Sequence, residues 1–339
     1  MTATAATPRV SVLVRVRNER SALVELCDRL DRQVIRDPWE VVVVDNESND
    51  GSGDVARERG ARVFTLPRHH FGYGVALNLG IEVSRGGYIT PLSAHAWPIQ
   101  KMWLQRLVDV LDGDERLAAA YSRQQPGAAA TPKEWLRFAE FGDTSHVVSS
   151  ADLRRAASSG GDVFDRCRYS NAAGILRRDV VTRLPFRDLG YAEDRAFALD
   201  AMAAGHAIAY VADVGVEYER PYTFHALFNV GTGSQIGKRL VLDLAVDQVG
   251  RPVGRSELGR RLGQVARRPV MLPLRVAQSL VRDGAAGRRA RQFEVASTGT
   301  TLGMLFGELR WRHHRDTTGH DPARLVAARA ALRHPEGES

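Results

Sequence analysis

The most chemically suggestive stretch of the sequence is the polar run DNESNDG, Asp45 to Gly51, which follows four consecutive valines. An uninterrupted β-branched run is typical of a strand buried on both faces, as in a parallel sheet covered by helices. In open α/β sheets, ligands bind at the carboxyl ends of such strands. Carboxylates there suit ribose hydroxyls or the N–H of a base, whereas a phosphate prefers backbone amides and positive charge. The alternative is an ordinary strand-to-helix loop with Asp and Asn as turn formers.

A second candidate is the acidic pair Glu193 and Asp194, which stands at the expected start of a helix ending at Gly205. The positive end of the helix dipole stabilises an ionised carboxylate there, so a purely structural role would also account for the pair. A carboxylate held in that position can also act as a general base toward a hydroxyl group.

The elements that must position these acids alternate between strand and helix. Apolar runs predict strands over residues 10–16, 41–44, 62–66, 88–92, 118–121, 171–176 and 208–211. Alternation of this kind predicts a doubly wound parallel sheet with its site at the strand carboxyl ends. We expect the polar section from about 126 to 168 to form loops rather than core, with one helix around Glu134 to Phe141.

Composition narrows the class of protein. At 339 residues and 37.3 kDa the chain can bury a large core. Two cysteines, Cys27 and Cys167, are too few for a disulfide framework, so we expect a reducing cytoplasm. The sequence shows no export signal and no apolar run long enough to span a bilayer.

Positive charge is concentrated in residues 251–339, which hold 17 Arg, no Lys and 8 Asp or Glu, a net charge of +9 against +7 for the whole chain. Such a segment can contact nucleic acid, anionic lipid or a phosphorylated substrate, but it lacks the interleaved aromatic residues of a nucleic-acid-binding protein. A merely solvated surface is the alternative. We expect helices that lie against the domain or a membrane surface, with the last twenty or so residues frayed.

Eight blocks in order resemble the family 2 glycosyltransferases of the GT-A fold. They are VSVLVRVRNE, VVVVDNESNDG, FGYGVALNLG, YITPLSAHAWP, YSRQQP, YSNAAGILRRD, LPFRDLGYAED and RPYTFHALF. The resemblance runs from about Val10 to Leu240 and is strongest to the bacterial branch that contains rhamnosyltransferase-like enzymes. It implies a Rossmann-like, mostly parallel central sheet flanked by helices, and transfer of a sugar from a nucleotide diphosphate donor with inversion.

The resemblance also implies roles for individual residues. Asp45 matches the acidic residue that holds the base or ribose of the donor, and Asp194, beside Glu193, matches the catalytic base. An inverting transfer needs one such carboxylate to take the proton of the acceptor hydroxyl as its oxygen attacks the anomeric carbon. The other donor-binding candidates are Arg17, Asn18, Glu19, Ser48, Asp50, Gly74, Asn78, Ser93 and Ala94. The candidates that face the sugar and the acceptor are Arg123, Gln124, Asn171 and Tyr191.

Two positions depart from the family pattern. His95 stands where the family has the aspartate of its metal motif, and Arg220 stands where it has a histidine before Pro221 and Tyr222. An imidazole can bind Mn²⁺ but is a poorer ligand for Mg²⁺, and an arginine ligates neither. We hypothesise that Arg220, together with His95, stabilises the leaving diphosphate where relatives use a divalent cation. His95 as a metal ligand and His95 as a histidine without a role remain the alternatives.

These patterns predict a GT-A domain over residues 1–240, with a nucleotide-sugar-binding half at about 8–125 and an acceptor-side half at about 126–240. Residues 241–339 form a basic helical extension in this prediction. The expected reaction moves a hexose or deoxyhexose from a dTDP- or UDP-linked donor to a hydroxyl of a saccharide, lipid-linked intermediate or natural product. The expected location is cytoplasmic, with peripheral contact to an anionic membrane. Rival functions are a catalytically silent sugar-nucleotide-binding protein and a nucleic-acid-binding protein that acts through the basic segment.

Overall fold

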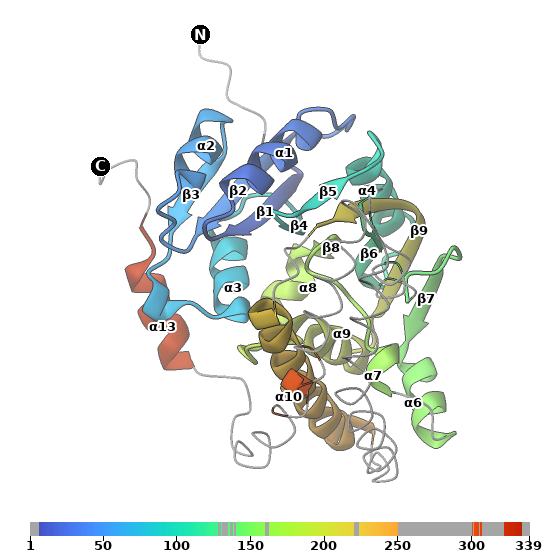
Figure 1. Ribbon diagram of the computed structural model, residues 1–339. Coiled ribbons are helices and arrows are strands. Elements are labelled where there is room, and N and C mark those ends of the chain that lie inside the picture. The colour runs from blue at the N-terminus through green and yellow to red at the C-terminus, as the bar shows by residue number, and fades with distance from the viewer. Residues whose placement is uncertain are drawn as a thin grey trace, which may run out of the picture.

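A nine-stranded sheet forms the centre of the part of the chain that the computed structural model describes (Figure 1). The described residues are 7–127, 130, 135, 138, 140–159, 163–219, 224–249, 300, 302–304, 306 and 322–333. The strands are β1 (Val10–Val16), β2 (Trp39–Asp45), β3 (Arg62–Thr65), β4 (Tyr88–Ser93), β5 (Ala96–Pro98), β6 (Leu117–Gln125), β7 (His146–Ser149), β8 (Gly174–Arg177) and β9 (Ala207–Tyr218). Their order in the sheet is β3-β2-β1-β4-β8-β6-β9-β5, and β7 pairs with β9.

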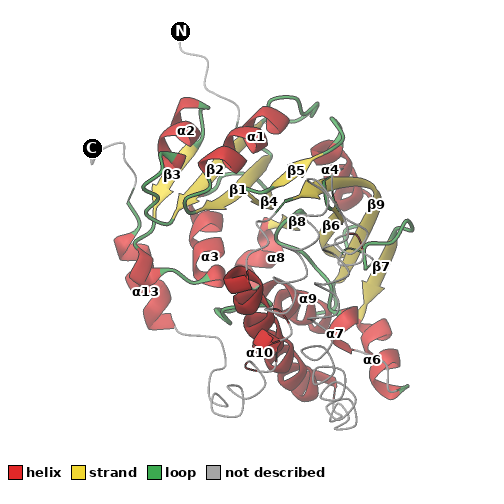
Figure 2. Ribbon diagram, in the orientation of Figure 1, coloured by secondary structure: helices red, strands yellow, loops and turns green. Residues whose placement is uncertain are grey.

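Helices cover both faces of this sheet (Figure 2). They are α1 (Arg20–Leu30), α2 (Ser52–Glu58), α3 (Tyr73–Val83), α4 (Trp103–Gly113), α6 (Ser150–Ser158), α7 (Val163–Arg166), α8 (Arg178–Arg183), α9 (Glu193–Ala203), α10 (Phe224–Val249) and α13 (Pro322–Ala331), with the 3₁₀ turn η1 at Arg68–His70. None of the helices described is long and apolar enough to cross a membrane.

The valine run of β2 explains why the sheet is buried on both faces. Val42 and Val44 pack into a core that also contains residues of α3 and α9, whereas Val43 points to the opposite core with residues of α1 and α4. Successive side chains of a strand point to opposite faces, so a sheet between two helical layers needs an apolar residue at every position. This confirms the interpretation of Val41–Val44 as a doubly buried strand.

The amino-terminal half has the predicted parallel arrangement. β1 pairs in parallel with both β2 and β4, and β2 pairs in parallel with β3. In this register Val16 lies opposite Asp45 of β2, and Arg15 lies opposite Ser93 of β4. The carboxyl ends of β1, β2 and β4 therefore lie side by side.

The second half departs from a wholly parallel sheet. β8 lies antiparallel between β4 and β6, and β5 and β7 are both antiparallel to β9. The sheet is therefore mixed, although β6 and β9 restore a parallel pair. The parallel direction of the strands was predicted from strand–helix alternation alone. β8 follows α7 and a loop rather than a helix that crosses over the sheet, so that rule does not apply to it.

The expectation that residues 126–168 form loops rather than core, with one helix around Glu134 to Phe141, was wrong for the part of this section that the structure describes. This section contributes β7 to the sheet, and α6 follows β7 directly through a capping box formed by Ser149 and Asp152. Leu153 and Val163 reach the core. These elements are short and mostly polar, so they lack the periodicity from which longer elements are predicted. Half of the residues from 134 to 141, where a helix was expected, lie outside the described residues.

The carboxyl-terminal helix α13 packs on the amino-terminal half of the chain, beside η1 and α3 (Figure 1). Ala328 is fully buried there. Arg333 then pairs with Thr65 of β3 through two backbone hydrogen bonds of 2.8 and 3.0 Å. Frayed ends were therefore a wrong expectation for residues 322–333. The predicted domain boundary at residue 240 falls inside α10.

Candidate active site

A pocket of about 390 Å³ opens where the carboxyl ends of β1 and β4 meet the start of α9 and one face of α10. Six of the predicted site residues line it: Ser93, Gln124, Asn171, Tyr191, Glu193 and Asp194. It is also lined by residues that were not predicted, among them Arg15, Ser170, Arg195 and Lys238. The structure thus brings the two acids to the end of the sheet at which ligands bind in α/β folds.

A strained turn presents the two acids to this pocket. Ala192 precedes α9 with a φ of 63°, in the left-handed region that a residue with a Cβ rarely adopts. Such a conformation costs about 1–2 kcal/mol and persists where its surroundings hold it. The surroundings here include α10, since a Cβ added at Gly237 would lie 2.6 Å from the carbonyl oxygen of Tyr191 and 2.7 Å from the Cβ of Ala192. Close packing of α10 therefore fixes the turn from which Glu193 and Asp194 project.

Glu193 is buried and held by two neighbours. Its Oε1 lies 3.7 Å from Nη1 of Arg15 and accepts a hydrogen bond of 3.3 Å from Nδ2 of Asn171. The other polar atom of that amide, Oδ1 of Asn171, is buried without a partner among the described residues. Glu193 is therefore a paired anion rather than an available base.

Asp194 has a different environment. Its Oδ1 accepts a hydrogen bond of 2.8 Å from the backbone N–H of Arg195, and no other hydrogen bond to its carboxylate occurs among the described residues. Burial, followed by the negative charge of Glu193, raises the pKa of Asp194 to about 7. A general base works best when its pKa lies near the operating pH. Asp194 therefore suits proton removal from a substrate hydroxyl.

The loops after β1 and β2 form a tied network around Asp45. Asp45 is buried, and its Oδ1 accepts hydrogen bonds from the N–H and the hydroxyl of Ser48 at 3.1 and 2.5 Å. The Ser48 hydroxyl oxygen accepts from the N–H of Asn18 at 3.0 Å, and Asp50 accepts from the N–H of Arg20 at 2.9 Å. Asp45, Ser48, Asn18 and Asp50 are thus brought together, as their predicted common role requires.

His95 bridges two elements. Its Nδ1 lies 2.8 Å from Oε1 of Glu19, and its Nε2 lies 3.1 Å from the hydroxyl of Tyr218. Both ring nitrogens are therefore engaged by protein groups, and a cation on either would have to displace one of them. Nowhere in the described part of the chain do three or more His, Cys, Asp or Glu side chains gather in a group that could hold a metal ion. These residues do not fit a divalent cation at His95.

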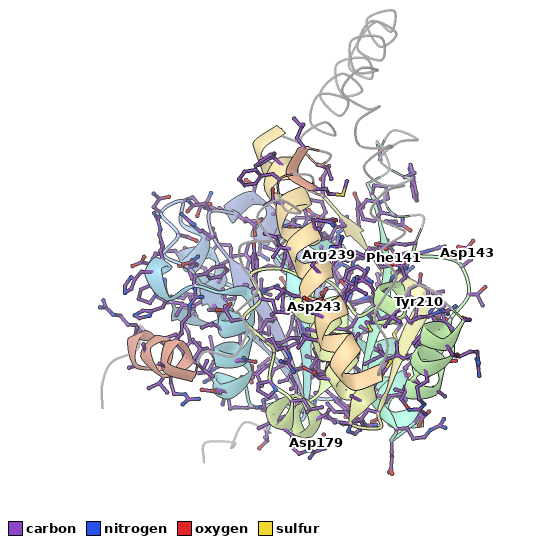
Figure 3. The ribbon with its side chains drawn as sticks, turned by 90° about the horizontal axis from the view of Figure 1, so that it is seen from below. Phe141, Asp143, Asp179, Tyr210, Arg239 and Asp243 are labelled. Atoms are coloured by element: carbon purple, nitrogen blue, oxygen red, sulfur yellow. The ribbon has the colours of Figure 1, made fainter. Side chains whose placement is uncertain are left out.

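The other predicted residues that the structure describes lie outside the pocket or serve its framework. Nδ2 of Asn78 donates to the carbonyl oxygen of Phe186 at 2.9 Å, and Oδ1 of Asn78 accepts from the N–H of Phe186 at 3.0 Å. Gly74 allows close approach of the Arg187 backbone. Arg123 is paired with Asp143 on the side of the molecule that carries Tyr210 (Figure 3). Ala94 is buried and Arg17 is exposed. Arg220 lies outside the described residues.

Arg15 was the main omission from the sequence-based prediction. Its guanidinium stacks over the Tyr73 ring at 5.4 Å and donates a hydrogen bond of 3.4 Å to the Tyr73 carbonyl oxygen. Tyr73 in turn meets the pocket-lining Tyr191 edge to face, with 5.9 Å between ring centroids. An arginine inside the otherwise apolar strand VSVLVRV was the available signal, because a charge there needs a partner or a ligand.

Comparisons with known proteins agree with this architecture. Residues 11–171 match the family model of Glycosyl transferase family 2. The chain is 32% identical over 219 residues to EpsH of Bacillus subtilis, which is named as a glycosyltransferase, and this match covers 60% of the chain and 59% of EpsH. It is 32% identical over 115 residues to glycosyltransferase AglE of Haloferax volcanii, covering 32% of the chain and 38% of AglE. The chain thus matches less than two thirds of the length of either relative.

Solved structures show the same fold. Mannosyltransferase PcManGT from Pyrobaculum calidifontis, in complex with GDP-Man and Mn²⁺, superposes with a TM-score of 0.55 at 17% identity and covers 88% of each chain. S. aureus TarS 1–349, in complex with UDP-GlcNAc, gives a TM-score of 0.51 at 16% identity, over 88% of this chain and 92% of TarS 1–349. The match over residues 11–171 shows a glycosyl transferase family 2 domain in this chain, and the likeness to these structures shows the GT-A fold.

Proposed function

We propose that the protein is an inverting glycosyltransferase in which Asp194 is the general base. The observation that carries this proposal is the position of Asp194. Its carboxylate, with a pKa near 7, lines a pocket at the carboxyl ends of β1 and β4 in a family 2 fold. Glu193 beside it is tied to Arg15 and Asn171, so only one acid of the pair is available to a substrate.

The chemistry follows from this division of roles. The acceptor hydroxyl gives its proton to Asp194 while its oxygen attacks the anomeric carbon of the donor sugar. The bond from that carbon to the diphosphate oxygen breaks on the opposite side, and the nucleoside diphosphate departs with the electron pair. One displacement of this kind inverts the configuration at the anomeric carbon.

The donor in this proposal is a nucleotide diphosphate sugar whose nucleoside is held by the Asp45 loop. PcManGT and TarS were solved with GDP-Man and UDP-GlcNAc, which supports a nucleotide sugar as the donor class. We propose a hexose or deoxyhexose linked to UDP or dTDP, and a hydroxyl acceptor on a saccharide, lipid-linked intermediate or natural product. The rhamnosyltransferase-like branch stays a prediction from the sequence blocks.

A divalent cation is a candidate cofactor because PcManGT was solved with Mn²⁺. The His95 position does not offer such an ion a set of carboxylates, so no step of the proposed mechanism is assigned to it. The proposed cytoplasmic location and peripheral contact with an anionic membrane rest on composition and on the charge of residues 251–339.

Replacing the base tests the proposal. Asp194→Asn should reduce the rate of nucleoside diphosphate release from a panel of UDP-, dTDP- and GDP-sugars by about 10²–10⁴-fold. The reason is that the asparagine side chain cannot take the proton of the attacking hydroxyl. Donor affinity, measured by calorimetry, should stay within about twofold, since Asp194 acts on the hydroxyl and not on the nucleotide.

Asp179→Asn is the matched control, because Asp179 is an exposed acid on α8 that pairs with Arg183 (Figure 3). It should retain the wild-type rate. Full activity in Asp194→Asn would refute the assignment of the base. Binding of a sugar nucleotide without any turnover by the wild type would instead favour the silent binding protein.

A further inference from the structure

We propose that Arg15 is a catalytic residue that binds the diphosphate of the donor and stabilises it as it leaves. This inference rests on the proposed function and adds to it the group that receives the leaving charge. The predicted candidates for that task were Arg220 and His95. Arg220 lies outside the described residues, and both ring nitrogens of His95 are engaged by Glu19 and Tyr218.

The position of Arg15 in the sheet is the first support. β1 lies between β2 and β4, with Val16 opposite Asp45 on one side and Arg15 opposite Ser93 on the other. Arg15, Ser93 and Asp194 all line the pocket. The diphosphate connects the nucleoside, proposed to lie at Asp45, with the sugar carbon, proposed to lie at Asp194. It must therefore cross the end of β1, where Arg15 stands.

The orientation of the guanidinium is the second support. Nη1 faces Oε1 of Glu193 and the carbonyl oxygen of Tyr73, and the guanidinium carbon lies over the Tyr73 ring. Within the described residues, Nε and Nη2 have no hydrogen-bond partner, and neither is a buried unsatisfied atom. Two donors of a fixed, planar fork thus remain available in the pocket, which is the geometry that recognises phosphate oxygens.

The environment of Arg15 strengthens this interaction. Its side chain is only 16% exposed, so its attraction to an anion is less screened than it would be at the surface. When the bond between the anomeric carbon and the diphosphate breaks, the electron pair remains on the phosphate oxygen. The positive charge of Arg15 is already in place and needs no reorganisation at that moment.

Binding measurements separate the diphosphate from the nucleoside. Kd is measured by calorimetry in EDTA for UDP, dTDP and GDP, and for uridine, thymidine and guanosine. The wild type should bind one diphosphate more tightly than its nucleoside. Arg15→Met should lose about tenfold or more of that preference, since hydrogen bonds to charged groups are worth this much. Its affinity for the nucleoside should be unchanged, and this also shows that the variant is folded. Arg15→Lys should retain part of the preference, because lysine keeps the charge and not the fork.

Arg62→Met is a closely matched control. Arg62 on β3 also stacks on an aromatic ring, Phe64 at 5.3 Å, pairs with a buried acid, Glu40 at 3.1 Å, and donates to a backbone carbonyl, that of Val83 at 2.9 Å. It stands at the first residue of its strand, at the end of the parallel sheet away from the pocket. Arg62→Met should keep the full diphosphate preference.

Two further readouts decide the proposal. The rate of nucleoside diphosphate release from the matching sugar nucleotide should fall by about 100-fold in Arg15→Met and remain at the wild-type value in Arg62→Met. The role of Arg15 would be overturned if Arg15→Met keeps the diphosphate preference of the wild type. It would also be overturned if the wild type shows the preference only with Mn²⁺ and the variant then shows the same preference. A wild type that binds no diphosphate of the panel, with or without Mn²⁺, would overturn the proposed function itself.

Discussion

The two adjacent acids in the pocket have different surroundings. Glu193 and Asp194 are neighbours in the sequence, yet Glu193 faces a guanidinium and an amide, whereas Asp194 receives a single backbone hydrogen bond. The negative charge of Glu193, which lies 3.7 Å from Arg15, opposes ionisation of Asp194. Carboxylates in different environments commonly divide catalytic roles in this way.

The dependence of the reaction on pH should report this pair. The base acts as a carboxylate, so kcat/KM should fall as the pH drops below about 7, the pKa of Asp194. Glu193→Gln removes a neighbouring negative charge and therefore makes ionisation of Asp194 easier. In the plot of kcat/KM against pH for this variant, the fall on the acidic side should therefore occur at a lower pH than in the wild type. The measurement is the rate of nucleoside diphosphate release between pH 5 and 9.

The control for this shift is Glu82→Gln, which removes a surface acid that pairs with Arg329 on α13. In this variant the activity should fall at the same pH as in the wild type. If the activity of Glu193→Gln falls at the same pH as that of the wild type, or at a higher pH, then Glu193 does not act on Asp194.

Among single residues, the sequence could predict those whose chemical group and place in a secondary-structure element both indicate the same role. Asp194 could be predicted because it is an acid at a helix start within a block that resembles the family, and it does line the pocket. Asn78 was predicted to bind the donor, but its amide bonds to the backbone of Phe186, and a loop more than one hundred residues away leaves no local signal of that contact. Arg15 was missed for a similar reason, since its partner Glu193 is even more distant in the chain.

At the scale of elements, α10 packs against the turn at Ala192, which precedes the two acids. Gly233 and Gly237, four residues apart on this helix, face Tyr191 so closely that an added Cβ at either would overlap with it. Positions four apart lie on one face of a helix. This contact holds the left-handed Ala192 and thereby aims Glu193 and Asp194.

Gly237→Ala should therefore impair the reaction more than the fold. In an unhindered helix the change would stabilise by about 1 kcal/mol, but here the new methyl group must push α10 from the turn. We expect kcat to fall by about tenfold or more, since small misplacements of catalytic groups are costly.

Gly113→Ala at the end of α4 provides the comparison, because nothing lies within 4 Å of the Cβ it would add. That variant should keep its rate and its melting temperature. An active Gly237→Ala enzyme with a raised melting temperature would show that α10 does not hold the turn.

The elements themselves were predictable to the extent that they are long and apolar. β1, β2 and β4 follow from largely apolar runs, and their parallel order follows from the helices between them. β5 and β7 have only three and four residues and are formed by pairing with β9. Partners that distant leave no local pattern, so neither these strands nor the antiparallel direction of β8 could be predicted.

At the scale of the whole molecule, the end of the chain returns to its beginning. α13 lies beside α3 and η1, and Arg333 pairs with the edge strand β3 (Figure 1). An unpaired edge strand is a site of aggregation, so this pairing protects β3. Part of the predicted basic extension is thus a structural component of the nucleotide-sugar-binding half.

Arg324 gives this closure a functional consequence. Its guanidinium pairs with Asp188 at 2.5 Å and donates to the carbonyl oxygen of Phe71 at 2.6 Å. Asp188 belongs to the loop that leads to Asp194, and Phe71 stands two residues before Tyr73 of the pocket. One side chain of α13 therefore connects the two loops that border the site.

Arg324→Met should consequently lower kcat by roughly tenfold through misplacement of these loops. Arg329→Met is the matched variant, because Arg329 lies on the same helix and pairs with Glu82 on α3. The exposed pair of Arg329 and Glu82 contributes at most about 1 kcal/mol, so Arg329→Met should melt within a few degrees of the wild type. Asp188 is largely buried, so loss of its partner in Arg324→Met should also lower the melting temperature. Rates of nucleoside diphosphate release and melting curves, measured together, distinguish the two effects. Equal rates in both variants would reduce α13 to a cover for the edge of the sheet, whereas a loss confined to Arg324→Met that Arg324→Lys partly restores would make it a support of the active site.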